Sequence, residues 1–203
     1  SELVYIGFEC FSNSSLLNIS IPKHLKSLSK SCFSNCLSFK SIDFSEGSEL
    51  VSIEQSAFYQ SSLEEIVIPN NVCRIEEFAF SCKSLKKVTF SEDSQLNFIG
   101  SFAFYDSSIA SIKIPCHVKE IYMSTFSSCH QLHEIEFFEN SELKSIGKEA
   151  FHASSLKIIS IPPSVEELQT GWCTTTLKLN QIIISPSNCH FSYIDNDKQM
   201  IAC

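Results

Sequence analysis

The sequence lacks the features of several common protein classes. It has only five glycines and six prolines among 203 residues, which excludes a collagen-like or disordered polymer. None of its apolar runs approaches the ~18–20 residues that a membrane-spanning helix needs, so we expect no membrane insertion within this chain. It has no initiator methionine, signal peptide or lipidation motif, and it starts inside a repeating pattern. We therefore expect it to be a fragment of a longer protein.

Basic residues are also scarce. The 15 basic residues include a single arginine, Arg74, and the formal net charge is −8. Binding to nucleic-acid phosphates needs clustered lysine and arginine, and no basic stripe occurs here, so a nucleic-acid partner is not expected. The acidic balance mainly favours solubility.

What the chain does contain is a short apolar unit repeated about eight times. The unit reads L-x-x-I-x-x-x-A-F and continues, after five or six residues, with L-x-x-I-x-I. We call the last residue of the A-F pair the marker residue; it falls at Phe11, Phe33, Phe58, Phe80, Phe104, Phe126, Phe151 and, in a degenerate eighth copy, Cys173. A unit this short cannot close its own core, so the copies are expected to stack and bury their apolar residues against one another.

The repeats alternate in length and in chemistry. Successive markers are 22, 25, 22, 24, 22, 25 and 22 residues apart, which indicates that a two-repeat unit has itself been duplicated. Every other L-x-x-I-x-I segment ends in Ile-Pro, at residues 21–22, 68–69, 114–115 and 161–162. The segments between them end in phenylalanine and lead to Ser-Glu-Leu or Ser-Gln-Leu. Proline cannot donate a ladder hydrogen bond, so it is expected to end strand pairing.

The pattern predicts a solenoid built mainly from β-strands. The last two apolar residues of L-x-x-I-x-I are two positions apart, so they lie on one face of a strand. Stacked copies would place these strands parallel in one long sheet, about 34 Å across for eight strands. We assign residues 1–184 to the solenoid. Residues 185–203, where the pattern stops, are interpreted as a short hairpin-like segment, which we expect to be truncated.

With the pattern written out, the chain resembles a BspA-type leucine-rich-repeat protein. The residues that carry the resemblance are IPNNVCRIEEFAFSCKSL at 68–85 and IGKEAF at 146–151. The resemblance covers nearly the whole chain. It implies an α/β-type, mostly β leucine-rich-repeat solenoid, with one parallel sheet on the concave face and short strands and helical turns on the convex face. It also implies a surface or secreted protein of a bacterium or protozoan parasite, used for adhesion.

Ten cysteines could in principle form disulfides or bind a metal. Six of them occupy repeat positions in which a free cysteine serves as a small buried hydrophobe: Cys10, Cys32, Cys36, Cys82, Cys129 and Cys173. We therefore expect buried thiols rather than bridges. Stacked equivalents such as Cys10 and Cys32 would lie about 4.8 Å apart, which only marginally permits a bridge. Thiol-rich usage is unusual for a protein exposed to an oxidising exterior.

No group of residues has the types and spacing expected of a catalytic or metal-binding site. Cys129, His130 and His133 form the most suggestive metal cluster, but the register puts Cys129 in a core turn and His133 on a strand, so the three should not converge. There is no C-x-x-C pair and no glycine-rich phosphate loop. No histidine is placed near Cys173, and neighbouring carboxylates such as Glu64 and Glu65 point apart. We expect no catalytic, cofactor-binding or metal-ligating residues, no cofactor and no enzymatic activity.

The outward positions of the L-x-x-I-x-I strands form the candidate binding surface. We propose as contact residues on this concave face Glu65, Val67, Lys87, Thr89, Lys113, Glu134, Glu136, Ile158 and Ile183. Any solvated sheet would carry most of these side chains. The exposed apolar ones are less usual: Ile158 and Ile183 belong to adjacent copies, near Phe138 and Trp172, and predict a small apolar patch that could be a contact site or the place where a further element packs.

The sequence therefore favours a protein-binding repeat module from a cell-surface or secreted adhesin, with a protein partner of unknown identity. An intracellular, cytoplasmic leucine-rich-repeat scaffold that keeps its thiols reduced is the alternative. A signal peptide or anchor in the full-length gene would favour the first, and free thiols on protein from cytosol would favour the second.

Overall fold

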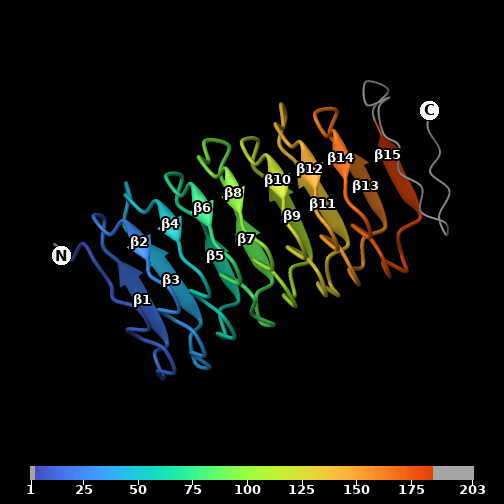
Figure 1. Cartoon of the computed structure of the whole chain (residues 1–203). Helices are drawn as coiled ribbons and strands as arrows, with labels where there is room; N and C mark the ends of the chain where they lie inside the picture. The colour runs from blue at the N-terminus through green and yellow to red at the C-terminus, as the bar shows by residue number, and fades with distance from the viewer. Residues whose placement is uncertain (1–2, 185–203) are drawn as a thin grey trace.

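The computed structural model describes residues 3–184, which form an elongated stack of β-strand turns running from one end of the chain to the other (Figure 1). The even-numbered strands contain two residues each: β2 (Ser27–Leu28), β4 (Ser52–Ile53), β6 (Arg74–Ile75), β8 (Phe98–Ile99), β10 (Glu120–Ile121), β12 (Ser145–Ile146) and β14 (Glu167–Leu168). The odd-numbered strands are longer: β1 (Asn18–Ile21), β3 (Ser41–Phe44), β5 (Glu65–Val67), β7 (Lys87–Thr89), β9 (Ser111–Ile114), β11 (Glu134–Phe137), β13 (Ile158–Ile161) and β15 (Gln181–Ile184). The predicted hairpin at 185–203 lies outside the described residues.

The even strands form one continuous parallel sheet of seven strands, in sequence order from β2 to β14. Each contributes the apolar residue of the L-x-x-I segment to an aligned row; Leu28 pairs with Ile53, and Ile53 with Ile75. All residues of this row are buried. The repeat register deduced from the sequence is therefore the register of the fold.

The odd strands are parallel but divide into four separate pairs, β1–β3, β5–β7, β9–β11 and β13–β15. The prediction of one long sheet on this side was wrong in that detail, because the ladder stops at three seams, each located before a strand that ends in Ile-Pro. Within the first pair the Ser45 nitrogen donates to the Ile21 carbonyl at 3.1 Å. The equivalent nitrogen one turn later belongs to Pro69, which has no hydrogen to donate.

A third side of each turn carries the marker residue, and it contains left-handed turns where helical turns were predicted. The residues two before and two after the marker have positive φ in nearly every copy, for example Ser56 (57°) and Gln60 (54°) around Phe58. This geometry lets alternate N–H groups reach the next turn; Phe58 donates to Ala79 at 2.8 Å. A helix would instead satisfy these groups within its own turn. No helix occurs among residues 3–184, and hence none there that could cross a membrane.

Aromatic stacking runs through the core. The rings of Phe11, Phe33, Phe58, Phe80, Phe104, Phe126 and Phe151 form a continuous stack with centroids 5.2–5.6 Å apart. In the degenerate last copy Trp172 stands in the alanine position, and its fully buried indole meets Phe151 edge-on at 6.2 Å. The row of parallel phenylalanine rings therefore ends at Phe151, and the indole continues the aromatic core in an edge-to-face contact.

The two kinds of loop after the odd strands explain the alternation in repeat length. In the longer loops a serine hydroxyl accepts a hydrogen bond from the leucine nitrogen two residues later, at 3.3 Å in all three copies: Ser48–Leu50, Ser94–Leu96 and Ser141–Leu143. In the shorter loops the proline carbonyl accepts a hydrogen bond from the backbone nitrogen three residues later; the Leu25 nitrogen, for example, donates to the Pro22 carbonyl. Each loop is therefore closed by a hydrogen bond of its own. The acceptor is a serine hydroxyl in one half of the duplicated unit and a proline carbonyl in the other half.

The register can be tested with two neighbouring substitutions on β5. Ile66→Asp places an unpaired carboxylate in the core, where Ile66 is 3% exposed, and should lower the free energy of unfolding by about 4 kcal/mol or more. Val67→Asp is the matched control: Val67 is 66% exposed, so the same new residue should cost less than about 1 kcal/mol. Urea denaturation followed by circular dichroism measures both, and equal losses would show that the register of β5 is wrong.

Candidate functional site

We call the outward surface of β1 to β15 the odd-strand face. It carries two rows of side chains, contributed by alternate residues of each odd strand. Of the nine residues proposed from the sequence, eight are exposed and Thr89 is half-buried. The structure thus confirms that these side chains point outward; their role in binding stays a prediction.

One row beside this surface is an ion-pair ladder. The Glu64 carboxylate, in the residue before β5, bridges Lys86 at 2.7 Å and Lys40 at 3.2 Å, which lie in the turns on either side. The hydrogen bond from Lys86, followed by that from Lys40, holds the pKa of Glu64 below its usual range. These exposed pairs add little stability individually, but they match opposite charges between neighbouring turns.

The odd-strand face is hollowed over β3, β5 and β7. The hollow has a volume of about 710 Å³, and its floor and walls include Asp43, Ser45, Glu65, Val67, Pro69 and Lys87. Of the residues that line the hollow, we call those on the strands its floor and those on the loops that follow the strands its wall. Val67 is thus a floor residue, and the ladder places it beside Thr89 and places Glu65 beside Lys87. Four of the residues proposed from the sequence, Glu65, Val67, Lys87 and Thr89, are therefore brought together. The other five lie outside the hollow.

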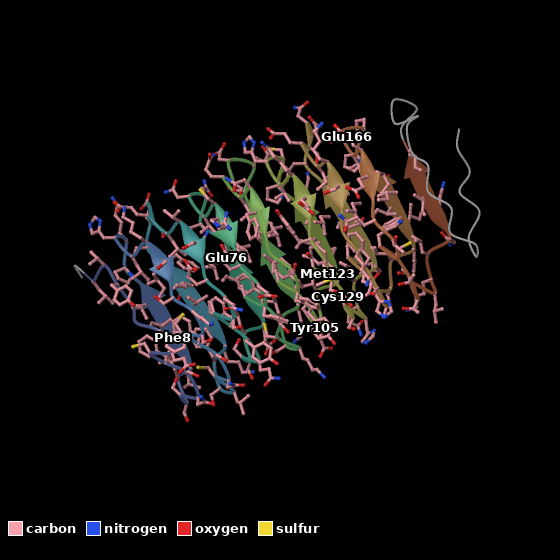
Figure 2. All side chains as sticks on the ribbon, viewed as in Figure 1. Phe8, Glu76, Tyr105, Met123, Cys129 and Glu166 are labelled. Carbon is pink, nitrogen blue, oxygen red and sulfur yellow. The ribbon has the colours of Figure 1, made fainter. Side chains whose placement is uncertain are left out.

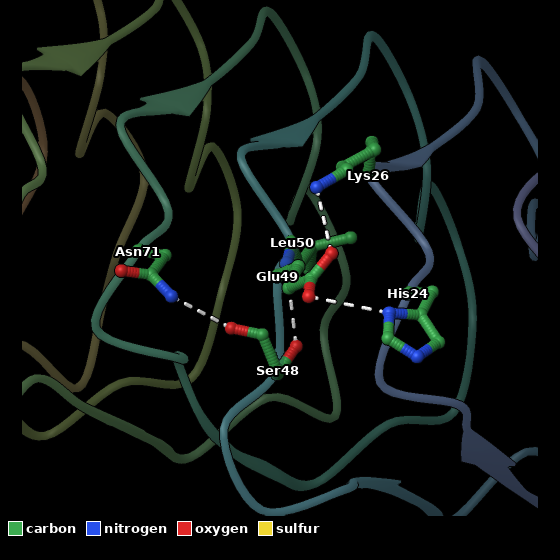
Figure 3. A network of polar contacts seen from close by, with 6 residues as sticks. All are labelled: His24, Lys26, Ser48, Glu49, Leu50 and Asn71. Atoms are coloured by element: carbon green, nitrogen blue, oxygen red, sulfur yellow. Dashed lines mark hydrogen bonds and ion pairs between the residues drawn. The ribbon is translucent and has the colours of Figure 1, made fainter.

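Two loops form the wall of the hollow, and a polar network joins them (Figure 3). Asn71 donates its side-chain amide to the Ser48 carbonyl at 2.8 Å. The adjoining Glu49 carboxylate is held by Lys26 at 2.7 Å and by His24 at 3.2 Å. The hydrogen bond from Lys26 makes the largest contribution to lowering the pKa of Glu49. The wall is thus tied to the turns on both sides of it.

Farther along the face, Lys113, Glu134 and Glu136 lie on the paired strands β9 and β11. Glu136 is opposite Lys113, whose ammonium group also lies 4.4 Å from the centre of the Phe138 ring. The outward positions of β9 and β11 thus carry charged side chains of both signs.

The apolar patch predicted near the C-terminal end is smaller than expected. Ile158 is 46% exposed and Ile183 is 44% exposed, on the paired strands β13 and β15. Trp172 does not join them, because its indole is in the core. The sequence pattern marked Trp172 as a departure but could not show that the indole would be buried in the core.

The cysteines of the described residues are all unbridged. Five of the six that were expected to be buried are buried: Cys32, Cys36, Cys82, Cys129 and Cys173. Cys10, in the first described turn, is exposed, contrary to expectation. Figure 2 shows Cys129 among the side chains of the central turns.

A buried ladder of alternating serine and cysteine explains why the thiols stay apart. It occupies the turn just after the marker and reads Ser14, Cys36, Ser61, Cys82, Ser107, Cys129, Ser154 and Thr176. The Cys36 thiol donates to the Phe11 carbonyl at 2.9 Å, and the Cys129 thiol donates to the Phe104 carbonyl at 3.1 Å. Since a serine separates successive thiols, they are two turns apart, about 10 Å, which is too far for a disulfide.

Burial also suppresses the reactivity of these thiols. It raises the pKa of Cys82 to about 12 and that of Cys129 to about 11. His130 and His133, which follow Cys129 in the sequence, are exposed while the thiol is buried. Among residues 3–184 no three histidine, cysteine or acidic side chains are grouped as metal ligands would be.

Sequence reasoning missed two aromatic clusters. On the marker side, Phe78 and Phe102 stack at 4.8 Å with Tyr59 and Tyr105 at their edges. On the even-strand side, the guanidinium of Arg74 lies 4.0 Å from the centre of the Phe98 ring. A signal was present: phenylalanine replaces serine, glutamate or glycine two residues before the marker in two adjacent copies.

Comparison with known proteins agrees with this architecture. The profile of the BspA type leucine rich repeat region matches residues 4–133 and 93–196, with six copies of the repeat. The crystal structure of a leucine-rich-repeat protein of T. pallidum is similar, with a TM-score of 0.64, 26% identity, and coverage of 73% of this chain and 68% of that one. A leucine-rich cell surface protein of Faecalibacterium prausnitzii has a TM-score of 0.33 and 19% identity, covering 96% and 86% of the two chains. No curated protein matches the sequence.

The thiol ladder predicts selective alkylation of the native protein. At pH 8, iodoacetamide should label Cys10 quickly and Cys82 and Cys129 at least about 100-fold more slowly, because the latter two are buried and protonated. Peptide mass spectrometry over a time course measures the rates, and the urea-unfolded protein, in which all sites react alike, is the control. Labelling of Cys129 at the rate of Cys10 would contradict the burial described above.

Proposed function

Because the chain belongs to the BspA-type leucine-rich-repeat family, we propose that it is the protein-binding module of a cell-surface or secreted adhesin. The odd-strand face is the surface that contacts the partner, which is a protein of a host, of the extracellular matrix or of another cell. The location at the cell surface rests on what is typical of the family.

One observation carries this proposal: the odd-strand face presents unpaired charges and exposed apolar side chains together on a rigid backbone. Glu65, Lys87 and Val67 share the hollow there. The parallel strands hold these side chains in regular rows about 4.8 Å apart, so little ordering entropy is lost on binding. Charges that change sign along the stack select a partner by electrostatic complementarity.

A second candidate function is an intracellular interaction scaffold. The observation that favours it is the state of the cysteines: all eight in the described residues are free. Reduced thiols are the rule in the cytosol, whereas small extracellular domains more often contain disulfides. The fold itself does not require an oxidising or a reducing compartment, because the thiols are small core residues.

Enzymatic activity is not part of the proposal. Burial raises the pKa of Cys32, Cys82 and Cys129, so these three thiols are protonated at neutral pH and are poor nucleophiles. The accessible odd-strand face carries charged side chains and a hollow, which are suited to binding a partner.

The binding face can be tested by charge reversal on β11. A double variant, Glu134→Lys with Glu136→Lys, should keep the melting temperature within about 3 °C, because both side chains are exposed. It should change the affinity for the ligand at least about tenfold, as expected when charges within an interface are reversed. The ligand is first identified by biolayer interferometry against purified matrix and host-surface proteins.

The matched control reverses two charges elsewhere. Glu92 and Glu167 are exposed but lie on a loop and on the even-strand side, so Glu92→Lys with Glu167→Lys should leave the affinity within about twofold. Equal effects of the two double variants would move the binding site away from the odd-strand face. Unfolding of the β11 variant would show that its glutamates do not point outward.

A further inference from the structure

We propose that the hollow over β3, β5 and β7 binds an arginine side chain of the protein partner. The aliphatic part of that side chain lies on Val67 and Pro69, and its guanidinium group lies between the carboxylates of Asp43 and Glu65. This assignment rests on the proposed function, since it gives a chemical identity to what the odd-strand face recognises.

The duplicated unit supplies an internal comparison for the hollow. The floor position held by Val67 is held by Lys113 and Ser160 in the next two units. The wall positions held by Ser45 and Gly47 are held by Ser91 and Asp93, and then by Phe138 and Asn140. The first unit therefore combines small wall residues with an apolar floor, and Val67 is 66% exposed there. All the units have the same backbone arrangement. The first unit therefore differs from the next two at these positions only in its side chains.

The charges inside the hollow are unpaired, unlike those beside it. Glu64 in the adjoining row is bridged by two lysines, Lys40 and Lys86. The side chains of Asp43, Glu65 and Lys87, which line the hollow, form no hydrogen bond or ion pair within residues 3–184. Two carboxylates against one ammonium leave the hollow with an excess of negative charge, which a cationic group would neutralise.

The combination of an apolar floor and two separated carboxylates fits arginine. Its methylene stem covers apolar surface while its charged head stays polar. Its planar guanidinium has five N–H donors and can bond to two carboxylates at once, and it is more weakly hydrated than the lysine ammonium. Pockets for small ligands measure roughly 300–1,000 Å³, so a hollow of about 710 Å³ holds one such side chain with part of its flanking backbone.

The wall is held in place before any partner arrives. The Asn71–Ser48 bond ties the two wall loops together, and Glu49 anchors the longer loop to Lys26 and His24 of the preceding turn (Figure 3). A preformed wall avoids the entropic cost of ordering a loop on binding.

The test uses three short peptides and the protein labelled with ¹⁵N. The probe is acetyl-Gly-Ala-Arg-Ala-Gly-amide, and its control carries citrulline, which has the shape of arginine without the charge. In a two-dimensional NMR titration the arginine peptide should shift the amide signals of β3, β5 and β7 and bind about tenfold more tightly than the citrulline peptide. Equal affinities for the two peptides, or shifts confined to other strands, overturn the assignment. Equal binding of a lysine peptide overturns the preference for a guanidinium group.

Variants then locate the site. Asp43→Asn with Glu65→Gln should weaken binding of the arginine peptide at least about fivefold, and Val67→Lys, which installs the residue of the next unit, should abolish it. The matched control, Glu92→Gln with Glu167→Gln, removes the same charge from exposed positions outside the hollow and should leave the affinity unchanged; an equal loss there overturns the proposal. Loss of protein-ligand binding on charge reversal at β11, with no response to the arginine peptide, would leave the proposed function standing and reject this inference alone. Binding of the arginine peptide by a protein that captures none of the purified matrix and host-surface proteins would instead reject the proposed function.

Discussion

The stacking of each turn on the next is the interaction on which everything else in this protein depends. Seven phenylalanine rings, 5.2–5.6 Å apart, define the repeat distance along the core. The backbone on the even-strand and marker sides of each turn finds its hydrogen-bond partners in the neighbouring turns, as Phe58 does in Ala79. A single copy has neither a closed core nor satisfied backbone groups, so the structure exists only as a stack.

Proline breaks this regularity on one side and so shapes the surface. Pro69, Pro115 and Pro162 lack the N–H group that would continue the ladder across the three seams, and the odd strands form four pairs instead of one sheet. The first seam lies in the floor of the hollow, whose loops are fastened by Asn71 and Glu49. The short loops that begin with proline therefore alter the shape of the odd-strand face as well as the length of the repeat.

The free thiols in the core bear on the compartment in which the protein acts. Cys36, Cys82 and Cys129 donate or accept hydrogen bonds within the core, two turns apart, and so serve as packing residues in either redox environment. The large number of free cysteines is therefore only a weak argument against a location at the cell surface.

The sequence by itself determined the register, the number of turns and the outward direction of residues such as Glu65 and Ile158, because a strict apolar period leaves one way to stack. It did not determine that the marker turns are left-handed, that Trp172 is buried in the core, or that Cys10 is exposed. Those outcomes depend on volumes and hydrogen bonds between residues more than 20 positions apart. The hollow was equally out of reach, since Asp43, Val67 and Lys87 become neighbours only when three turns lie side by side.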